Sequence, residues 1–305
     1  MLTGGWTRPA KALNPVAMTR LRSLLFVPGD RPERFAKAAA SGADALILDL
    51  EDSVALDAKP AAREAVAAYL GEPRTVPAYV RINPLDTLMA DLDLDAVARL
   101  NPDGIVLPKA EGAISVAELA ARLERRGNET ALILPIATET ANAMFQLGTY
   151  GAQAARLAGL TWGAEDLPTA IGAETSREAD GRYTPPYEVA RVFTLFGAAA
   201  AGVAPIETVY PAFRDLDGLA AYAARGARDG FTGMMALHPI QVPLINAAFT
   251  PSAEVIAHAR AVVEAFAAHP GAGVLSLDGR MIDRPHLVQA ERVLARAGEE
   301  AVARS

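Results

Sequence analysis

The segment RSLLFVPGDRPERFAKAAASGADALILDLEDSV, residues 22–54, decides the fold class because it holds one complete strand–helix–strand unit. Two aliphatic runs, residues 24–27 and 45–50, flank an alanine-rich stretch that ends at Gly42. Runs of this length are typical of buried strands, and a glycine is typical of the position just past a helix end. A helix between two such strands indicates a parallel pair.

The same alternation continues along the chain, with aliphatic runs separated by alanine-rich segments that have helical spacing. The further runs occupy residues 78–82, 104–108, 131–136, 156–162, 205–210 and 232–237. Together with the first two they make eight predicted strands. Near-continuous apolar strands that alternate with amphipathic helices indicate an α/β fold with a parallel sheet. Eight such units predict a closed (β/α)8 TIM barrel rather than an open doubly wound sheet.

The predicted barrel occupies residues 22–250, and two segments lie outside it. Residues 1–21 have no apolar core of the length that a signal peptide needs, so we interpret them as a flexible N-terminal arm. Residues 251–305 begin with a predicted helix over 252–268 and are interpreted as a C-terminal helical extension that acts as a lid. The chain has no uncharged apolar run of about 18 residues, so no membrane span is expected.

The composition excludes several classes of function. With 305 residues, of which 51% are hydrophobic and 21% charged, the chain has enough apolar material for a large core. Its net charge of −7 and its lack of basic runs argue against a nucleic-acid partner. The sequence contains no cysteine, which excludes disulfides, thiolate catalysis and cysteine-based metal sites, and favours a reducing cytoplasm.

Polar side chains recur at and just after the predicted strand ends, where barrel enzymes place their active sites. In chain order they include Asp49, Glu51, Asp52, Arg81, Lys109, Glu111, Glu139, Glu165, Asp166 and His238. Because carboxylates crowded at one mouth repel one another, the pattern predicts a bound cation, and Mg²⁺ suits an oxygen-rich site. Any single carboxylate among them has a local alternative, because acidic residues are also favoured at helix starts.

Several motifs, in this order, resemble the citrate lyase β-subunit family, which includes malyl-CoA and citramalyl-CoA lyases. They are the opening segment quoted above, YVRINP, LPKAE, LPIATET, WGAEDL and the late DGRMIDRPH, and the resemblance runs over about residues 22–298. It implies a β/α barrel with a C-terminal extension, Mg²⁺ dependence and reversible carbon–carbon cleavage of a 3-hydroxyacyl thioester. It also implies a homotrimer or a larger assembly of trimers, such as a hexamer.

Carried over by position, the resemblance assigns the metal to Glu139, in LPIATET, and to Asp166, in WGAEDL. Arg81, in YVRINP, resembles the arginine that binds the substrate's carboxylate and carbonyl oxygen, a task that suits a planar guanidinium. The alternative for Arg81 is an ion pair with Glu51 or Asp52. Those two acids are expected to hold metal-bound waters in place.

The resemblance also concerns the substrate and the proton donor. Backbone amides around Ala164 and Glu165 are expected to donate to the substrate carboxylate. Asp283, in the MID motif, resembles an acid that reaches the active site of a neighbouring subunit and protonates the thioester enolate. Its alternative is a surface or helix-capping role ahead of Pro285.

The binding of coenzyme A is less clearly marked in the sequence. The candidates for contact with its phosphates are Arg22, Arg31, Lys37 and Lys59. Their alternative is simple solvation, because long basic side chains often lie on an exposed face. The sequence has neither a P-loop nor a Rossmann glycine motif. His238 has no second histidine beside it in the sequence and is interpreted as a structural hydrogen-bonding residue.

The expected function is Mg²⁺-dependent cleavage of (S)-citramalyl-CoA or malyl-CoA to acetyl-CoA and pyruvate or glyoxylate. One alternative is the β subunit of a citrate lyase complex, which acts on a citryl thioester carried by an acyl-carrier protein. A metal-dependent pyruvate aldolase would use a similar Glu and Asp pair, but the MID segment argues against it by resemblance. A non-catalytic interaction subunit would be expected to lack Glu139, Asp166, Arg81 or Asp283, and all four are present.

Overall fold

The computed structural model describes residues 20–298, and its central feature is an eight-stranded parallel sheet. The strand order is β5-β4-β3-β2-β1-β8-β7-β6. Strand β1 (Ser23–Pro28) pairs in parallel with β2 (Ala45–Asp49) on one side and with β8 (Gly233–Ala236) on the other. The first and last strands of the predicted barrel are therefore hydrogen-bonded neighbours.

The two remaining edges of the sheet also meet. They are β5 (Leu132–Pro135) and β6 (Leu160–Thr161). Parallel bridges join Ile133 to Leu157 and Ile136 to Thr161, and the Ala158 amide donates to the Ile133 carbonyl at 2.9 Å. The sheet thus closes on itself, and the predicted (β/α)8 barrel is confirmed.

The other strands and the helices follow the predicted alternation. The remaining barrel strands are β3 (Ala78–Arg81), β4 (Gly104–Leu107) and β7 (Pro205–Glu207). The α-helices of the barrel are α1 (Phe35–Ala39), α2 (Lys59–Gly71), α3 (Leu88–Val97), α4 (Ala113–Glu124), α5 (Leu167–Ile171), α6 (Pro185–Ala201), α7 (Leu216–Asp229) and α8 (Val242–Ala248). Short 3₁₀ segments are η1 (Pro32–Arg34), η2 (Leu56–Ala58), η3 (Ala98–Leu100), η4 (Ala143–Phe145), η5 (Leu147–Arg156) and η6 (Pro239–Gln241). None of the helices in residues 20–298 is long and apolar enough to cross a membrane.

Two apolar layers hold the barrel together. Alternate strand residues such as Leu24, Ile47 and Met235 belong to one buried cluster, which fills the interior of the barrel. Their sequence neighbours, such as Leu25 and Leu46, belong to a second cluster that lies between the strands and the helices. The strands are thus apolar on both faces, which explains the continuous aliphatic runs in the sequence.

Two connections differ from the predicted pattern. The run 156–162 contributes only Leu160–Thr161 as strand, and the run 205–210 only Pro205–Glu207. The chain between β5 and β6 forms 3₁₀ turns instead of an α-helix. Gly148 and Gly151 lie in that stretch, and glycine disfavours the interior of an α-helix.

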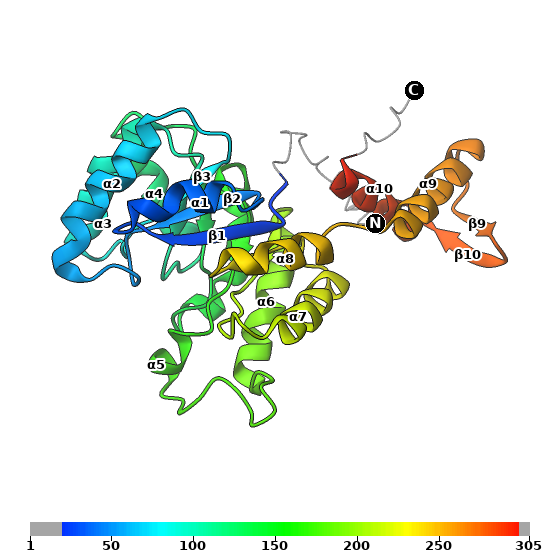
Figure 1. Ribbon diagram of the computed structural model, residues 1–305. Helices are drawn as coiled ribbons and strands as arrows, with labels where there is room; N and C mark the ends of the chain where they lie inside the picture. The colour runs from blue at the N-terminus through cyan, green and yellow to red at the C-terminus, as the bar shows by residue number, and fades with distance from the viewer. Residues whose placement is uncertain (1–19, 299–305) are drawn as a thin grey trace, which may run out of the picture.

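The C-terminal segment forms a small unit of its own. Helix α9 (Ala253–Ala268) packs against α10 (Arg284–Ala297), and β9 (Val274–Leu277) pairs with β10 (Arg280–Asp283) as an antiparallel hairpin. These elements share a separate apolar cluster that includes Phe266. Figure 1 shows them projecting away from the barrel.

Candidate active site at the barrel mouth

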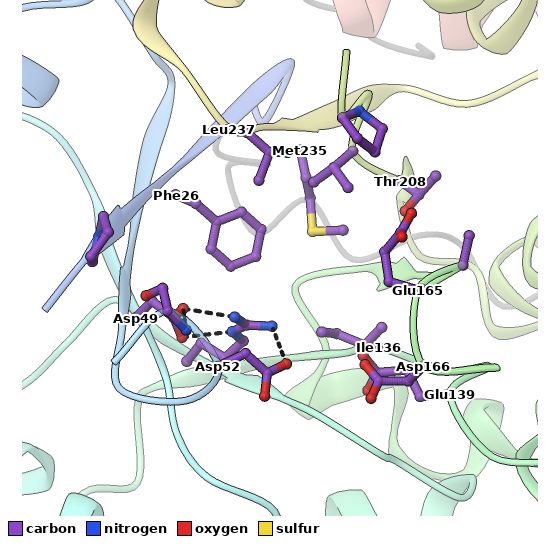
Figure 2. Close-up of a pocket in the computed structure, with 17 residues that line it drawn as sticks. Phe26, Asp49, Asp52, Ile136, Glu139, Glu165, Asp166, Thr208, Met235 and Leu237 are labelled. Carbon is purple, nitrogen blue, oxygen red and sulfur yellow. Dashed lines mark hydrogen bonds and ion pairs between the residues drawn. The ribbon is translucent and has the colours of Figure 1, made fainter. Parts of the chain in front are cut away.

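The C-terminal ends of the barrel strands surround a pocket of approximately 370 Å³. Its lining residues are Phe26, Pro28, Asp49, Asp52, Ser53, Arg81, Ile136, Glu139, Gly163, Ala164, Glu165, Asp166, Thr208, Val209, Pro211, Met235 and Leu237. Figure 2 shows Phe26, Met235 and Leu237 on one side and Asp52 and Asp166 on the other. The pocket therefore has an apolar wall that faces a group of carboxylates.

The two predicted metal ligands both line this pocket, from neighbouring strands. Glu139 follows β5 and is 5% exposed, and its Oε2 accepts a hydrogen bond from the Lys109 amide at 2.6 Å. Asp166 follows β6, and its Oδ1 lies 3.6 Å from the Lys109 ammonium. Gly163 permits this arrangement, because a Cβ at that position would lie 2.9 Å from Cγ of Glu139. Lys109 thus contacts both carboxylates, once through its backbone and once through its side chain.

The electrostatics of Glu139 indicate that the site suits a cation. Burial, together with the charges of Glu51 and Asp166, raises the pKa of Glu139 to about 8 against the opposing Lys109 amide. Within residues 20–298 there is no cluster of three or more acids, histidines or cysteines arranged to hold a metal. Two carboxylates form a hard, all-oxygen donor set, and Mg²⁺ is usually bound by one or two carboxylates together with water. The residues present therefore fit Mg²⁺.

Arg81, at the end of β3, is held by a planar two-point contact. Its Nε and Nη2 each donate to one oxygen of Asp49 at 2.7 Å, and Nη1 lies 2.9 Å from Glu51 Oε2. Although burial alone would raise the pKa of Asp49, the hydrogen bonds and charge of Arg81 hold it below its ordinary value. The guanidinium also lies over the Phe26 ring at 4.9 Å. The ion pair with Glu51, which was the alternative role of Arg81, is thus present, and the same side chain also lines the pocket.

Glu51 and Asp52 lie on the loop after β2 in different environments. Glu51 is 5% exposed, and burial raises its pKa to about 7 despite the nearby charge of Arg81. Asp52 is largely exposed and lines the pocket. Lys59 fixes this loop, because its ammonium donates to the carbonyls of Leu50 and Glu51 at 2.8 and 2.9 Å.

Ala164 and Glu165 also line the pocket, between β6 and Asp166. Their position at the mouth agrees with the expected contact to a substrate carboxylate, which stays a prediction.

Asp283 is not among the residues that line the pocket. It ends β10 and caps α10, where its Oδ1 lies 2.5 Å from His286 Nδ1 and the His286 amide points to the same oxygen. The hydrogen bond from His286 lowers the pKa of Asp283. Within one chain Asp283 therefore has the capping role that was its alternative.

The four candidates for coenzyme A phosphates separate into two groups. Arg22 lies at the start of β1, at the opposite end of the barrel, where it pairs with Asp44 at 2.7 Å. Lys59 is buried and already donates to two carbonyls. Neither side chain lines the pocket, and each is already held by partners within the chain, which favours a structural role over contact with coenzyme A. Arg31 and Lys37 are exposed and lie after the mouth end of β1, so they remain candidates.

Sequence reasoning placed Asp49 and Lys109 at strand ends but gave them no role. The structure shows Asp49 as the anchor of Arg81 and Lys109 as a contact to both acids of the metal pair. The signal for Asp49 was available, because β2 and β3 end together and Asp49 is the register partner of Arg81. The assignment of His238 as a structural residue agrees with its cap of η6, where its ring accepts from the Ile240 amide.

Comparison with known proteins gives the same grouping as the sequence motifs. A family model described as HpcH/HpaI aldolase/citrate lyase matches residues 22–239, which is well over half of the chain. The chain belongs to this family. The predicted resemblance is confirmed, and so is the expectation of a carbon–carbon lyase at the level of the family.

Individual members of the HpcH/HpaI aldolase/citrate lyase family are similar over almost their whole length. A citrate lyase subunit beta-like protein of Mycobacterium tuberculosis is 42% identical over 276 residues, 90% of this chain and 95% of the relative. A (3S)-malyl-CoA thioesterase of Cereibacter sphaeroides is 34% identical over 289 residues, 92% of this chain and 95% of the relative.

A solved structure in the same family adds ligands to the comparison. The CitE protein of Mycobacterium tuberculosis, in complex with magnesium, acetoacetate and coenzyme A, is 39% identical and superposes with a TM-score of 0.76. The match covers 92% of this chain and all of that one. The barrel found here is therefore the fold of a family member that binds magnesium and coenzyme A.

Proposed function

We propose that this chain is a Mg²⁺-dependent lyase that cleaves (S)-citramalyl-CoA or malyl-CoA to acetyl-CoA and pyruvate or glyoxylate. The observation that carries the proposal is the pair Glu139 and Asp166 beside Arg81 in one pocket at the barrel mouth. In support, the similar CitE structure holds magnesium and coenzyme A, and one similar relative is named for malyl-CoA.

The chain's own residues prepare the site for a cation. Glu139 and Asp166 would hold Mg²⁺, which when bound supplies Lewis-acid activation of a 2-hydroxy acid. The Lys109 amide fixes one oxygen of Glu139, so this carboxylate is oriented before any cation arrives. Gly163 keeps the approach to Glu139 free of a side chain.

Arg81 and the loop after β2 handle the substrate and the hydroxyl proton in this proposal. Asp49 orients the guanidinium of Arg81, which binds the carboxylate of the oxo acid that is released. Glu51 and Asp52 order the water that accepts the hydroxyl proton. As that proton leaves, the carbon–carbon bond breaks and its electron pair becomes the thioester enolate.

The enolate must then receive a proton on carbon, and we assign this step to Asp283 of a neighbouring copy. Asp283 of the same chain does not line the pocket, so a second subunit is the natural source. In the reverse direction Asp283 would act as the base that removes this proton.

Assembly into a homotrimer or hexamer forms part of the proposal. An exposed apolar face of α6 supports a contact between subunits. It carries Val189, Val192, Phe193 and Phe196, which are 46, 36, 47 and 63% exposed. The lack of cysteine fits a reducing cytoplasm, where we propose that the protein acts.

The pocket lining favours a hydroxyacyl group without an additional carboxylate. Within residues 20–298, Arg81 is the one cation among the lining residues, and it is already assigned to the carboxylate of the oxo acid. The opposite wall is apolar, with Phe26, Met235 and Leu237. A hydrogen or methyl substituent suits this wall better than the carboxymethyl group of a citryl thioester.

The second candidate is a citrate lyase β subunit that acts on citryl-acyl-carrier protein. It is supported by the similar relative that is named citrate lyase subunit beta-like. The test is to incubate the purified protein and Mg²⁺ separately with citramalyl-CoA, malyl-CoA and a citryl thioester. Release of pyruvate or glyoxylate is expected. Release of oxaloacetate alone would favour the second candidate, and free coenzyme A without an oxo acid would indicate thioester hydrolysis instead of carbon–carbon cleavage.

A further inference from the structure

Glu207, the last residue of β7, carries a carboxylate that is fully buried between the strands and the helices. It accepts hydrogen bonds from Trp162 Nε1 at 2.6 Å, from Arg191 Nε at 2.7 Å and from the Tyr222 hydroxyl at 3.0 Å. The amide of Thr208 also donates to it at 3.0 Å. A buried carboxylate with this many donors is held in one orientation.

The first of these donors connects Glu207 to the metal pair. Trp162 directly follows β6, and its side chain points to Glu207, outside the barrel. The next residue, Gly163, lies beside Glu139, because a Cβ added there would be 2.9 Å from Glu139 Cγ. The Gly163 amide donates to the Thr138 hydroxyl, which donates to the Gly163 carbonyl, both at 3.2 Å. The chain then continues through the segment that carries Asp166. The position of Trp162 therefore controls how the β6 end lies against Glu139.

A second connection leads from the same carboxylate to the pocket wall. The Thr208 amide donates a hydrogen bond to Glu207, and Thr208 lines the pocket next to Val209. One buried side chain thus fixes the ends of two adjacent strands, β6 and β7, from the side that faces away from the substrate.

We propose that Glu207 is a positioning residue that, through Trp162, sets the separation of Glu139 and Asp166. It does not touch the pocket, and its effect on the metal is carried by the backbone of residues 162–166. This inference rests on the proposed function, because it takes Mg²⁺ as the cation that the pair binds. Partners of this kind orient a metal site without being ligands themselves.

A structural role in stability alone is the competing explanation, since removal of a buried charge partner destabilises a protein in any case. Arg191, which donates to Glu207, also donates to Asp229, and Asp229 offers a control. Asp229 Oδ2 accepts from Arg191 Nη1 at 2.8 Å and from no group of the metal segment that the structure describes. Asp229→Asn therefore weakens the ion pair with Arg191 and leaves the three side-chain hydrogen bonds to Glu207 in place.

The test compares Glu207→Gln, Trp162→Phe and Asp229→Asn with the wild type. Trp162→Phe keeps an aromatic ring but removes the N–H donor together with part of the ring volume, so it serves as a second variant if Glu207→Gln folds poorly. Calorimetric titration of the metal-free proteins with Mg²⁺ gives the dissociation constant, and thermal unfolding gives Tm. We expect about a tenfold increase in the dissociation constant for Glu207→Gln and Trp162→Phe. Asp229→Asn is expected to lower Tm and to leave the dissociation constant unchanged.

An unchanged Mg²⁺ dissociation constant in Trp162→Phe, or an equal increase in Asp229→Asn, would show that the cluster acts only on stability and would overturn the inference. A wild-type protein that binds no Mg²⁺ would overturn the metal site itself, and with it the role of Glu207. Wild-type binding without effect of the variants would overturn only the role of Glu207.

Discussion

Glu139 at the barrel mouth and Asp283 in the C-terminal extension are assigned to the same reaction, but they lie in opposite environments. Glu139 is 5% exposed, and burial raises its pKa to about 8. The side chain of Asp283 is 36% exposed, and His286 holds its pKa below the usual range. The first acid lines a pocket that is already formed within one chain. The second lies on a helix end and needs a substrate brought to it.

The two regions also differ in how they are built. The mouth is held by contacts between distant parts of the chain, such as Arg81 with Asp49 and Lys109 with Glu139. The extension has its own apolar cluster, and its acid is fixed by a residue three positions away. Metal binding and proton transfer are therefore expected to respond separately to substitution.

The largest effect is expected for Glu139→Gln, which removes one of the two proposed ligands. The Mg²⁺ dissociation constant should increase by at least about 100-fold, because the remaining acid cannot hold the ion alone. Titration calorimetry measures this effect, and Glu118→Gln, on the exposed face of α4, is the control. Unaltered binding in Glu139→Gln would remove this residue from the metal site.

Asp283→Ala should distinguish the function of the C-terminal extension from that of the barrel mouth. Cleavage is expected to fall by about 10²- to 10⁴-fold, the usual contribution of a general acid, while Mg²⁺ binding stays intact. His286→Ala is the matched control, because it removes the capping partner and keeps the carboxylate. Mixed assemblies of Asp283→Ala and Glu139→Gln chains should regain activity if the acid acts on a neighbour. Full turnover in Asp283→Ala would show that the extension does not supply the proton.

Arg81→Lys tests the recognition part of the mouth. A lysine keeps the charge but loses the planar contact to Asp49 and to a substrate carboxylate. We expect kcat/KM to fall by about 100-fold, with little change in Mg²⁺ binding, when initial rates are measured on the same thioester. An equal loss in both quantities would mean that Arg81 supports the metal pair rather than the substrate.

The smallest effect is expected for Asp49→Asn, which removes the ion pair with Arg81 and lowers the stability of the fold. The folded pKa of Asp49 lies below its ordinary value of 3.8, so the pair stabilises the fold above that pH and loses its contribution as the pH falls through the folded value. Asp49→Asn should lower the free energy of unfolding by roughly 2 kcal/mol near neutral pH. Urea unfolding at several pH values should show the difference shrinking in acid. A constant difference at all pH values would exclude this cause.

The same contrast between the regions explains what the sequence could predict. Barrel strands are apolar on both faces, so periodicity located them, and their ends indicated where Glu139, Asp166 and Arg81 would gather. Lys59 could not be placed in this way, because its direction depends on how α2 packs against the β2 loop. The same holds for Glu207, since its partner Trp162 is 45 residues away in the chain.

For Asp283, the local sequence pattern predicted the capping contact but not the role in the assembly. Its capping role is local and was foreseen as the alternative, whereas its catalytic role depends on how a second chain is placed. The pairing of Asp49 with Arg81 was more accessible, because the two residues end neighbouring strands. Sequence patterns thus located the barrel mouth, and packing determines which side chains line it.

The most direct test of the central claim is the metal dependence of cleavage at the mouth. Wild-type protein is incubated with citramalyl-CoA or malyl-CoA in Mg²⁺ and, in parallel, after removal of the metal by EDTA, and the release of pyruvate or glyoxylate is followed. We expect oxo-acid release with Mg²⁺, loss of release with EDTA and recovery when Mg²⁺ is restored. Release that continues in EDTA, or that persists in Glu139→Gln, would contradict this claim.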